Sequence, residues 1–155
     1  MAIIDLEALA TRARLMALDV GEKTVGIALG TTALALASPL ETIRRTRFAA
    51  DAQRIFALAD EHGVDALVVG LPVNMDGSEG RRCQSVRQFA ADLLARRDIA
   101  AAFWDERLST AAVTRAMIEA DLSRRKRAEA VDRLAAAYIL QGALDRIRNL
   151  NGEPG

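Results

Sequence analysis

Four acidic residues lie in otherwise apolar surroundings and are the side chains of this sequence best suited to chemistry. They are Asp19, Asp105, Glu106 and Asp132. A buried carboxylate is costly unless it is paired or binds a metal ion. Carboxylates that converge repel one another, and a divalent cation relieves that repulsion. Because the donors are hard oxygen atoms without His or Cys, the pattern favours Mg²⁺ or Mn²⁺.

Each of these acids also has a purely structural interpretation. Strand ends reach water, and helix N-termini favour anions, so an acid at either place is common. Asp105 and Glu106 compete for one role, since strand alternation sends neighbouring side chains to opposite faces of a sheet. Asp132 shares its helical arc with a set of small or apolar residues, which predicts that it faces inward. That set is Ala135, Ala136, Ile139 and Ala143.

Apolar periodicity predicts an alternation of strands and helices that would position these acids. Expected strands cover 15–20, 25–30, 33–43, 65–71 and 99–106. Expected helices run from Phe48 to about His62, through the apolar stripe of residues 86–94, and over about 110–120 and 128–148. The order βββαβαβαα, a hairpin followed by crossovers, favours an α/β fold with a mixed sheet and helices on its faces.

Length and composition narrow the remaining classes. The 155 residues suffice for one domain with its own core. We expect a helical extension at 1–13, the catalytic domain at 14–149 and a flexible tail at 150–155. A single cysteine, Cys83, excludes an internal disulfide framework, and a single histidine, His62, argues against a Ser–His–Asp triad. No membrane-length apolar run and no signal peptide are found, which predicts a cytoplasmic protein without a membrane partner.

Net charge is zero, with 21 basic and 21 acidic residues, but the basic residues are unevenly distributed. They concentrate in three stretches, at 44–54, 81–97 and 124–133. The run SRRKR at 123–127 precedes the helix that carries Asp132. Such a run is either a solvated loop or, beside a metal site, a clamp on a phosphate backbone.

The segment GLPVNMDGSEG at 70–80 follows a predicted buried strand. Ligand-binding loops of α/β sheets lie at this end of the strands, although an ordinary strand-to-helix turn has a similar composition. No Lys–Ser/Thr pair follows the last glycine, so it is not a P-loop. Ser109 and Thr110 are typical of a helix N-cap and could also reach a phosphate.

Five motifs in this order resemble a known family. They are LDVGEKTVGIAL (18–29), ASPLETI (37–43), VVGLPVNMDGSEG (68–80), DERLST (105–110) and SRRKRAEAVDRLAAAYILQGAL (123–144). Together they resemble the YqgF-type family of bacterial proteins, described as Holliday junction resolvases and as pre-16S rRNA nucleases. The resemblance extends from about Leu15 to Asp145.

This resemblance implies a ribonuclease H-like fold with a five-stranded mixed sheet flanked by helices. Its three metal-binding acids correspond to Asp19, Glu106 and Asp132. Further family positions near the nucleic-acid path correspond to Lys23, Asn74 and Arg107. The chain departs from the family pattern at Lys23–Thr24 and Gly30–Thr31, where the family often has Lys–Arg and Ser–Asp. These departures concern secondary substrate contacts and leave the three acids in place.

The leading hypothesis is a divalent-metal-dependent endonuclease acting on structured nucleic acid, with two Mg²⁺ or Mn²⁺ ions held by the three acids. The phosphate-binding residues of this hypothesis are Arg124, Arg125, Lys126 and Arg127. The favoured substrate is ribosomal RNA precursor at the 16S 5′ end, with the ribosomal particle as a partner, and the alternative is a Holliday junction in DNA recombination. Other classes left open are a non-catalytic nucleic-acid-binding module and a nucleotide-binding domain. A junction resolvase would be a homodimer, whereas an RNA-trimming enzyme can act as a monomer.

Overall fold

A five-stranded mixed sheet forms the centre of the computed structural model, which describes residues 4–108 and 124–150, with backbone alone for 124–132. The strands are β1 (Arg14–Val20), β2 (Thr24–Thr31), β3 (Leu36–Arg44), β4 (Ala66–Leu71) and β5 (Ala100–Asp105). Their order across the sheet is β3-β2-β1-β4-β5. The β1–β2 and β2–β3 pairs are antiparallel, while β1–β4 and β4–β5 are parallel. The mixed sheet expected from the hairpin and crossovers is therefore confirmed.

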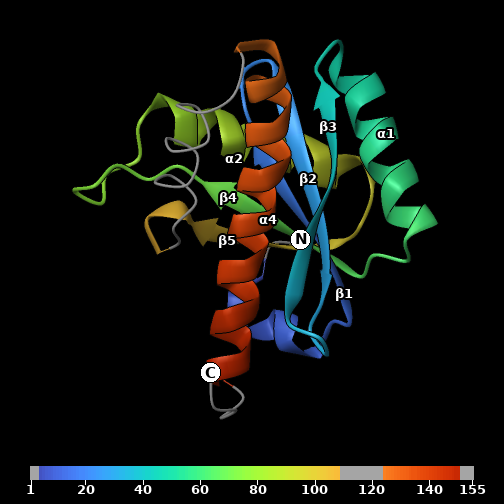
Figure 1. Cartoon of the computed structure of the whole chain (residues 1–155), viewed down its shortest axis with the longest axis vertical. Helices are drawn as coiled ribbons and strands as arrows, with labels where there is room; N and C mark the ends of the chain where they lie inside the picture. The colour runs from blue at the N-terminus through green and yellow to red at the C-terminus, as the bar shows by residue number, and fades with distance from the viewer. Residues whose placement is uncertain (1–3, 109–123, 151–155) are drawn as a thin grey trace.

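Helices cover both faces of this sheet. Helices α1 (Phe48–Glu61) and α2 (Arg81–Arg96) pack on one face, and α4 (Arg124–Leu150) crosses the other, as Figure 1 shows. Two hydrophobic clusters result, one on each face of the sheet. The 3-10 helix η1 (Leu6–Thr11) contributes the fully buried Leu9 to the α4 side, so the N-terminal segment packs against the domain.

Alternation along β1 decides which way its acid points. Met16, Leu18 and Val20 belong to the cluster under α1 and α2, whereas Leu15 and Ala17 belong to the cluster under α4. Asp19 continues the second set and therefore faces α4. The continuous apolar sequence of this strand follows from its central position, where both faces are covered.

Helix α4 starts earlier than the sequence predicted. The expected start near residue 128 is wrong, because Arg124, Arg125, Lys126 and Arg127 form the first turn of α4 rather than a loop. Arg and Lys are good helix formers and this run contains neither Gly nor Pro, so the helix continues through it. The predicted helix at 110–120 lies outside the described residues. The C-terminal residues 151–155 also lie outside them, while Leu150 still belongs to α4.

Among the described residues, none of the helices combines the length and apolar character needed to cross a bilayer.

Candidate active site

Asp19 is one of two buried charged residues in the described part of the chain, with 5% of its surface exposed. It lies near the end of β1, opposite Gly26 of β2. On the other side, the parallel pair Leu18–Val69 places Asp19 level with Gly70 of β4. The strand positions on either side of the Asp19 carboxylate therefore carry no side chain.

Glu106 reaches the same part of the sheet from the end of β5. It opens the 3-10 helix η2 (Glu106–Leu108), and its Oε2 lies 3.4 Å from the point where a Cβ on Gly70 would be. The Cδ1 of Ile139, on α4, lies 2.5 Å from that same point. Gly70 therefore has Glu106, Ile139 and, by register, Asp19 as neighbours on the α4 side of the sheet.

Asp105 takes the opposite direction and a different partner. Side chains two positions apart in a strand share a face. Asp105 therefore takes the side of Phe103, which packs under α1 and α2, whereas Glu106 takes the side of Trp104, which packs under α4. The Arg107 guanidinium binds the Asp105 carboxylate through Nη2 at 2.7 Å and Nε at 3.1 Å. These hydrogen bonds hold the pKa of Asp105 below its usual value. Of the two competing acids, Glu106 is the one that lies on the same face as Asp19.

The third acid expected at this site, Asp132, lies on α4 seven residues before Ile139. Two helical turns correspond to about 10.5 Å along the axis. The side chain of Asp132 lies outside the described part, as do those of Arg124, Arg125, Lys126 and Arg127, and Ser109 and Thr110 lie outside it entirely. Within the described residues, no group of three or more His, Cys, Asp or Glu side chains is arranged to hold a metal ion.

The loop after β4, residues 72–80, is closed by its own polar groups. The Asn74 N–H donates to the Ser78 carbonyl at 2.9 Å, and its Nδ2 donates to Ser78 Oγ at 3.0 Å. Asp76 accepts from the Ser78 N–H and hydroxyl, and these bonds lower the pKa of Asp76. Gly77 takes a left-handed φ of 90° at the turn. Asn74, expected on the nucleic-acid path, is exposed and engaged in shaping this loop.

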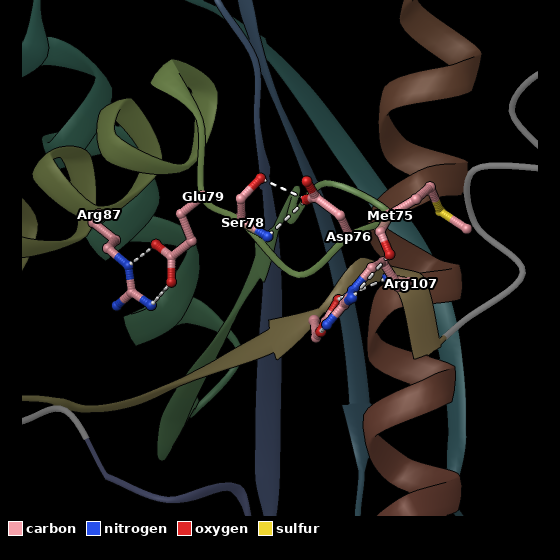
Figure 2. A network of polar contacts seen from close by, with 7 residues as sticks. Met75, Asp76, Ser78, Glu79, Arg87 and Arg107 are labelled. Atoms are coloured by element: carbon pink, nitrogen blue, oxygen red, sulfur yellow. Dashed lines mark hydrogen bonds and ion pairs between the residues drawn. The ribbon is translucent and has the colours of Figure 1, made fainter.

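Arg107 ties this loop to the end of β5. Besides binding Asp105, its Nη1 donates to the Met75 carbonyl at 3.4 Å, as Figure 2 shows. The Met75 side chain points away from these polar contacts and is 87% exposed. Lys23, the other expected cation, is exposed in the β1–β2 turn, where its carbonyl accepts from the Arg45 N–H at 2.8 Å.

Gly26 and Gly70 are site residues that the sequence reasoning did not single out. Both lie inside strands, where glycine is unfavourable and often marks a close approach of backbone to another group. That position within a buried apolar run was the available signal. What it could not show is that the two glycines flank the same aspartate, because this depends on strand register.

Comparison with known proteins shows the family to which this sequence is similar. The family model described as "RuvX: Holliday junction resolvase" matches residues 13–146. A protein of Paramagnetospirillum magneticum named "Putative pre-16S rRNA nuclease" is 58% identical over 140 residues, covering 90% of each chain. One of the same name from Phenylobacterium zucineum is 54% identical and covers 96% of this chain and 97% of its own.

Among solved structures, Thermus thermophilus RuvC in complex with a Holliday junction substrate superposes with a TM-score of 0.55. It is 11% identical and covers 90% of this chain and 96% of its own, which shows a shared fold. Sheet order, helix placement and this similarity define the class, a ribonuclease H-like nuclease fold. Within that class, the chain belongs to the RuvX family. The family named from the sequence motifs is thereby confirmed.

Proposed function

We propose that this protein is a divalent-metal-dependent endonuclease that processes ribosomal RNA precursor at the 5′ end of 16S rRNA. The observation that supports it most directly is the placement of Asp19 and Glu106 on the same face of the sheet, around Gly70. The names of relatives that are more than half identical to this chain support pre-16S rRNA as the substrate class, and the 5′ end is part of the proposal.

The carboxylate donors of the described residues fit a magnesium or manganese site. Asp19 and Glu106 supply carboxylate oxygens, the ligands that these cations prefer. Gly26 and Gly70 flank Asp19 in the neighbouring strands, so no side chain of these two positions competes with its carboxylate. Asp132 is the proposed third ligand, because α4 carries it toward the same face. A divalent cation bound there would polarise the scissile phosphate and activate water for attack.

The protein's own residues would hold the nucleic acid in place around these acids. Arg107, which binds Asp105 and the Met75 carbonyl, is proposed to position the loop 72–80 for the substrate. The cations in the first turn of α4, Arg124 to Arg127, are proposed phosphate ligands, together with Lys23, Asn74, Ser109 and Thr110. Contacts of this kind position a backbone without reading its sequence.

A second candidate substrate is a Holliday junction, favoured by the description of the matching family model. The two substrates require different oligomeric states of the protein. Symmetric cuts in a four-way junction require a twofold dimer, whereas trimming an RNA end does not. The ribosomal particle would be a partner only in the RNA reaction.

The decisive experiment compares wild type with Asp19→Asn on a labelled pre-16S RNA fragment and a labelled four-way junction, with Mg²⁺ or Mn²⁺. We expect wild type to cut the RNA and the variant to lose about a hundredfold or more in rate, as when a transition-state contact is removed. The melting temperature of wild type should also rise with Mn²⁺, since a ligand of the folded state stabilises it, and that of the variant should not.

Asp51→Asn is the matched control, because Asp51 is the other buried aspartate of the described chain and lies on α1. It should retain cleavage and the Mn²⁺ response. Full metal-dependent cleavage by Asp19→Asn would refute the proposal. Cutting of the junction alone would favour the resolvase, and binding of either substrate without cutting would favour a non-catalytic binding module.

A further inference from the structure

A cavity of about 520 Å³ lies on the face of the sheet opposite α4. Its walls are the β1–β2 turn at Gly21 and Glu22, the start of α1 at Phe48, and the part of α2 from Arg81 to Asp92. Val20 lines it and directly follows Asp19 in β1, with the side chains on opposite faces. The cavity and the acids therefore lie at the same end of the sheet, separated by the thickness of the sheet.

Two basic stretches of the sequence meet at this cavity. Arg45 comes from the stretch 44–54, and Arg81 and Arg82 come from the stretch 81–97. The proposed catalytic chemistry uses neither stretch. Because the three guanidinium groups line one cavity, which we call the arginine cavity, their clustering is a property of the fold and not of the sequence.

Arg45 is held in a fixed orientation. Its Nη1 donates to the Gly21 carbonyl at 2.6 Å, and its guanidinium lies 5.0 Å from the centre of the Phe89 ring. Its Nε is 4.0 Å from the Asp51 carboxylate. A guanidinium that is already oriented loses less conformational freedom when it binds an anion.

The Arg81 and Arg82 side chains are exposed, and neither guanidinium forms a hydrogen bond or an ion pair with the part of the chain that the structure describes. Arg87, five residues after Arg82 on α2, is instead bound by Glu79 through two hydrogen bonds of 2.6 and 2.8 Å. The first turn of α2 contains no acid, and its N-cap, Gly80, forms no side-chain cap. Two cations at the positive end of a helix are unfavourable there unless an anion compensates them.

The other end of the cavity has a different chemistry. Gln88 and Asp92 line it, and the Gln88 amide donates to the Asp92 carboxylate at 2.8 Å. Asp92 lies eleven residues after Arg81, about 16 Å along the helix axis. Amide and carboxylate groups can exchange hydrogen bonds with the edge of a base, and the half-buried Phe48 adds apolar surface beside them. The lining of the cavity thus contains three guanidinium groups and two carboxylates, those of Glu22 and Asp92.

We propose that the arginine cavity binds one nucleotide of a single strand that flanks the scissile bond. Its phosphate lies at Arg81 and Arg82, and its base lies toward Gln88. The volume is within the range of small-ligand sites, roughly 300–1,000 Å³. This inference rests on the proposed function, since the strand that reaches the cavity is the substrate continuing past the β1–β2 turn from the acids.

The test measures binding in EDTA, so that it does not depend on cleavage. The probes are a fluorescent duplex RNA with a single-stranded extension of eight nucleotides and the same duplex without it. Arg81→Ala/Arg82→Ala removes the phosphate contacts, and Ser85→Trp fills the cavity at an exposed position without changing charge. The matched control is Arg12→Ala/Arg146→Ala. It removes two exposed arginines, one before β1 and one near the C-terminal end of α4.

We expect both cavity variants to weaken binding of the extended duplex about tenfold and to leave the blunt duplex nearly unchanged. The arginine variant should also reduce the salt slope by about 1.4, or about 0.7 for each lost single-strand contact. The control should affect both probes equally and weakly. Melting temperatures within the range of wild type establish that the variants are folded.

Equal losses for both probes, or a cavity variant that behaves like the control, would overturn the proposal. So would displacement of the fluorescent RNA by micromolar AMP or CMP without any dependence on the extension, since this would identify a free-nucleotide site. Extension-dependent binding by a protein that cuts neither RNA nor junction would support the cavity while refuting the nuclease.

Discussion

Replacing Gly70 by alanine tests whether α4 is seated against the acids as the structure indicates. An added Cβ would lie 2.5 Å from Ile139 Cδ1 and 3.2 Å from Ile139 Cγ1. Carbon atoms in contact prefer about 3.5–4.0 Å, so the first of these distances is short by about 1 Å. The Glu106 carboxylate, at 3.4 Å, is in ordinary contact and need not move. The strain therefore falls on the Ile139 side chain or on α4 itself.

The size of the effect follows from the burial of Ile139, which is completely enclosed. Overpacking a filled core costs about 1–3 kcal/mol. For a chain of this length, 1 kcal/mol corresponds to about 2–4 °C, so Gly70→Ala should lower the melting temperature by about 2–12 °C. If α4 shifts by about 1 Å, the helix carrying Asp132 shifts with it, and such displacement of a catalytic group can cost up to about a hundredfold in rate.

Ile139→Val provides the matched variant, because valine lacks the Cδ1 that causes the clash. Alone it should cost about 0.5–1.5 kcal/mol through the lost methyl group. The double variant should then be more stable than the sum of the single effects predicts, by about 1 kcal/mol, as measured by urea unfolding of all four proteins. Additive free energies of unfolding would refute the proposed contact. Cleavage rates measured in parallel should recover in the double variant.

Three further predictions concern single contacts. The Trp104 Nε1 is buried without a hydrogen-bond partner among the described residues, so Trp104→Phe breaks no hydrogen bond there, and its cost in urea unfolding, about 1–2 kcal/mol, should come from the cavity that the smaller ring leaves in the core. The hydrogen-bonded Arg54 lowers the pKa of Glu41. The stability from this pair is therefore present above the unfolded pKa of about 4.3 and is lost as pH falls through the lower folded value. Arg54→Ala should make the free energy of unfolding less dependent on pH in that window, and an unchanged dependence would contradict the pairing. Arg107→Ala should raise the pKa of Asp105, which NMR titration can detect, and should reduce cleavage at a nearly constant melting temperature. Arg107→Lys lacks the planar pair of N–H donors, so it should not return the pKa of Asp105 to its wild-type value.

Local patterns in the sequence were sufficient to predict most of the elements. Continuous apolar runs predicted β1 and β4, because central strands covered on both faces need no polar alternation. The spacing of apolar residues in α2 predicted which side of it packs, and Gly63, with a φ of 62°, ends α1 where expected. The predicted start of α4 was wrong. A run of cations suggested a loop, whereas the intrinsic helix preference of Arg and Lys extends the helix through that run.

Residue types identified Asp19, Asp105 and Glu106 as candidates, and the motif resemblance implied Glu106 over Asp105. Only the tertiary structure shows which of the two acids lies on the same face of the sheet as Asp19. That choice depends on which face of the sheet each side chain takes and on Arg107, which binds Asp105. The role of Gly26 and Gly70 likewise depends on register, since glycines 44 residues apart flank one aspartate through pairing with β1. The arginine cavity has the same origin. A sequence records which charges exist, whereas the distances that determine their interactions arise when β1, α1 and α2 pack together.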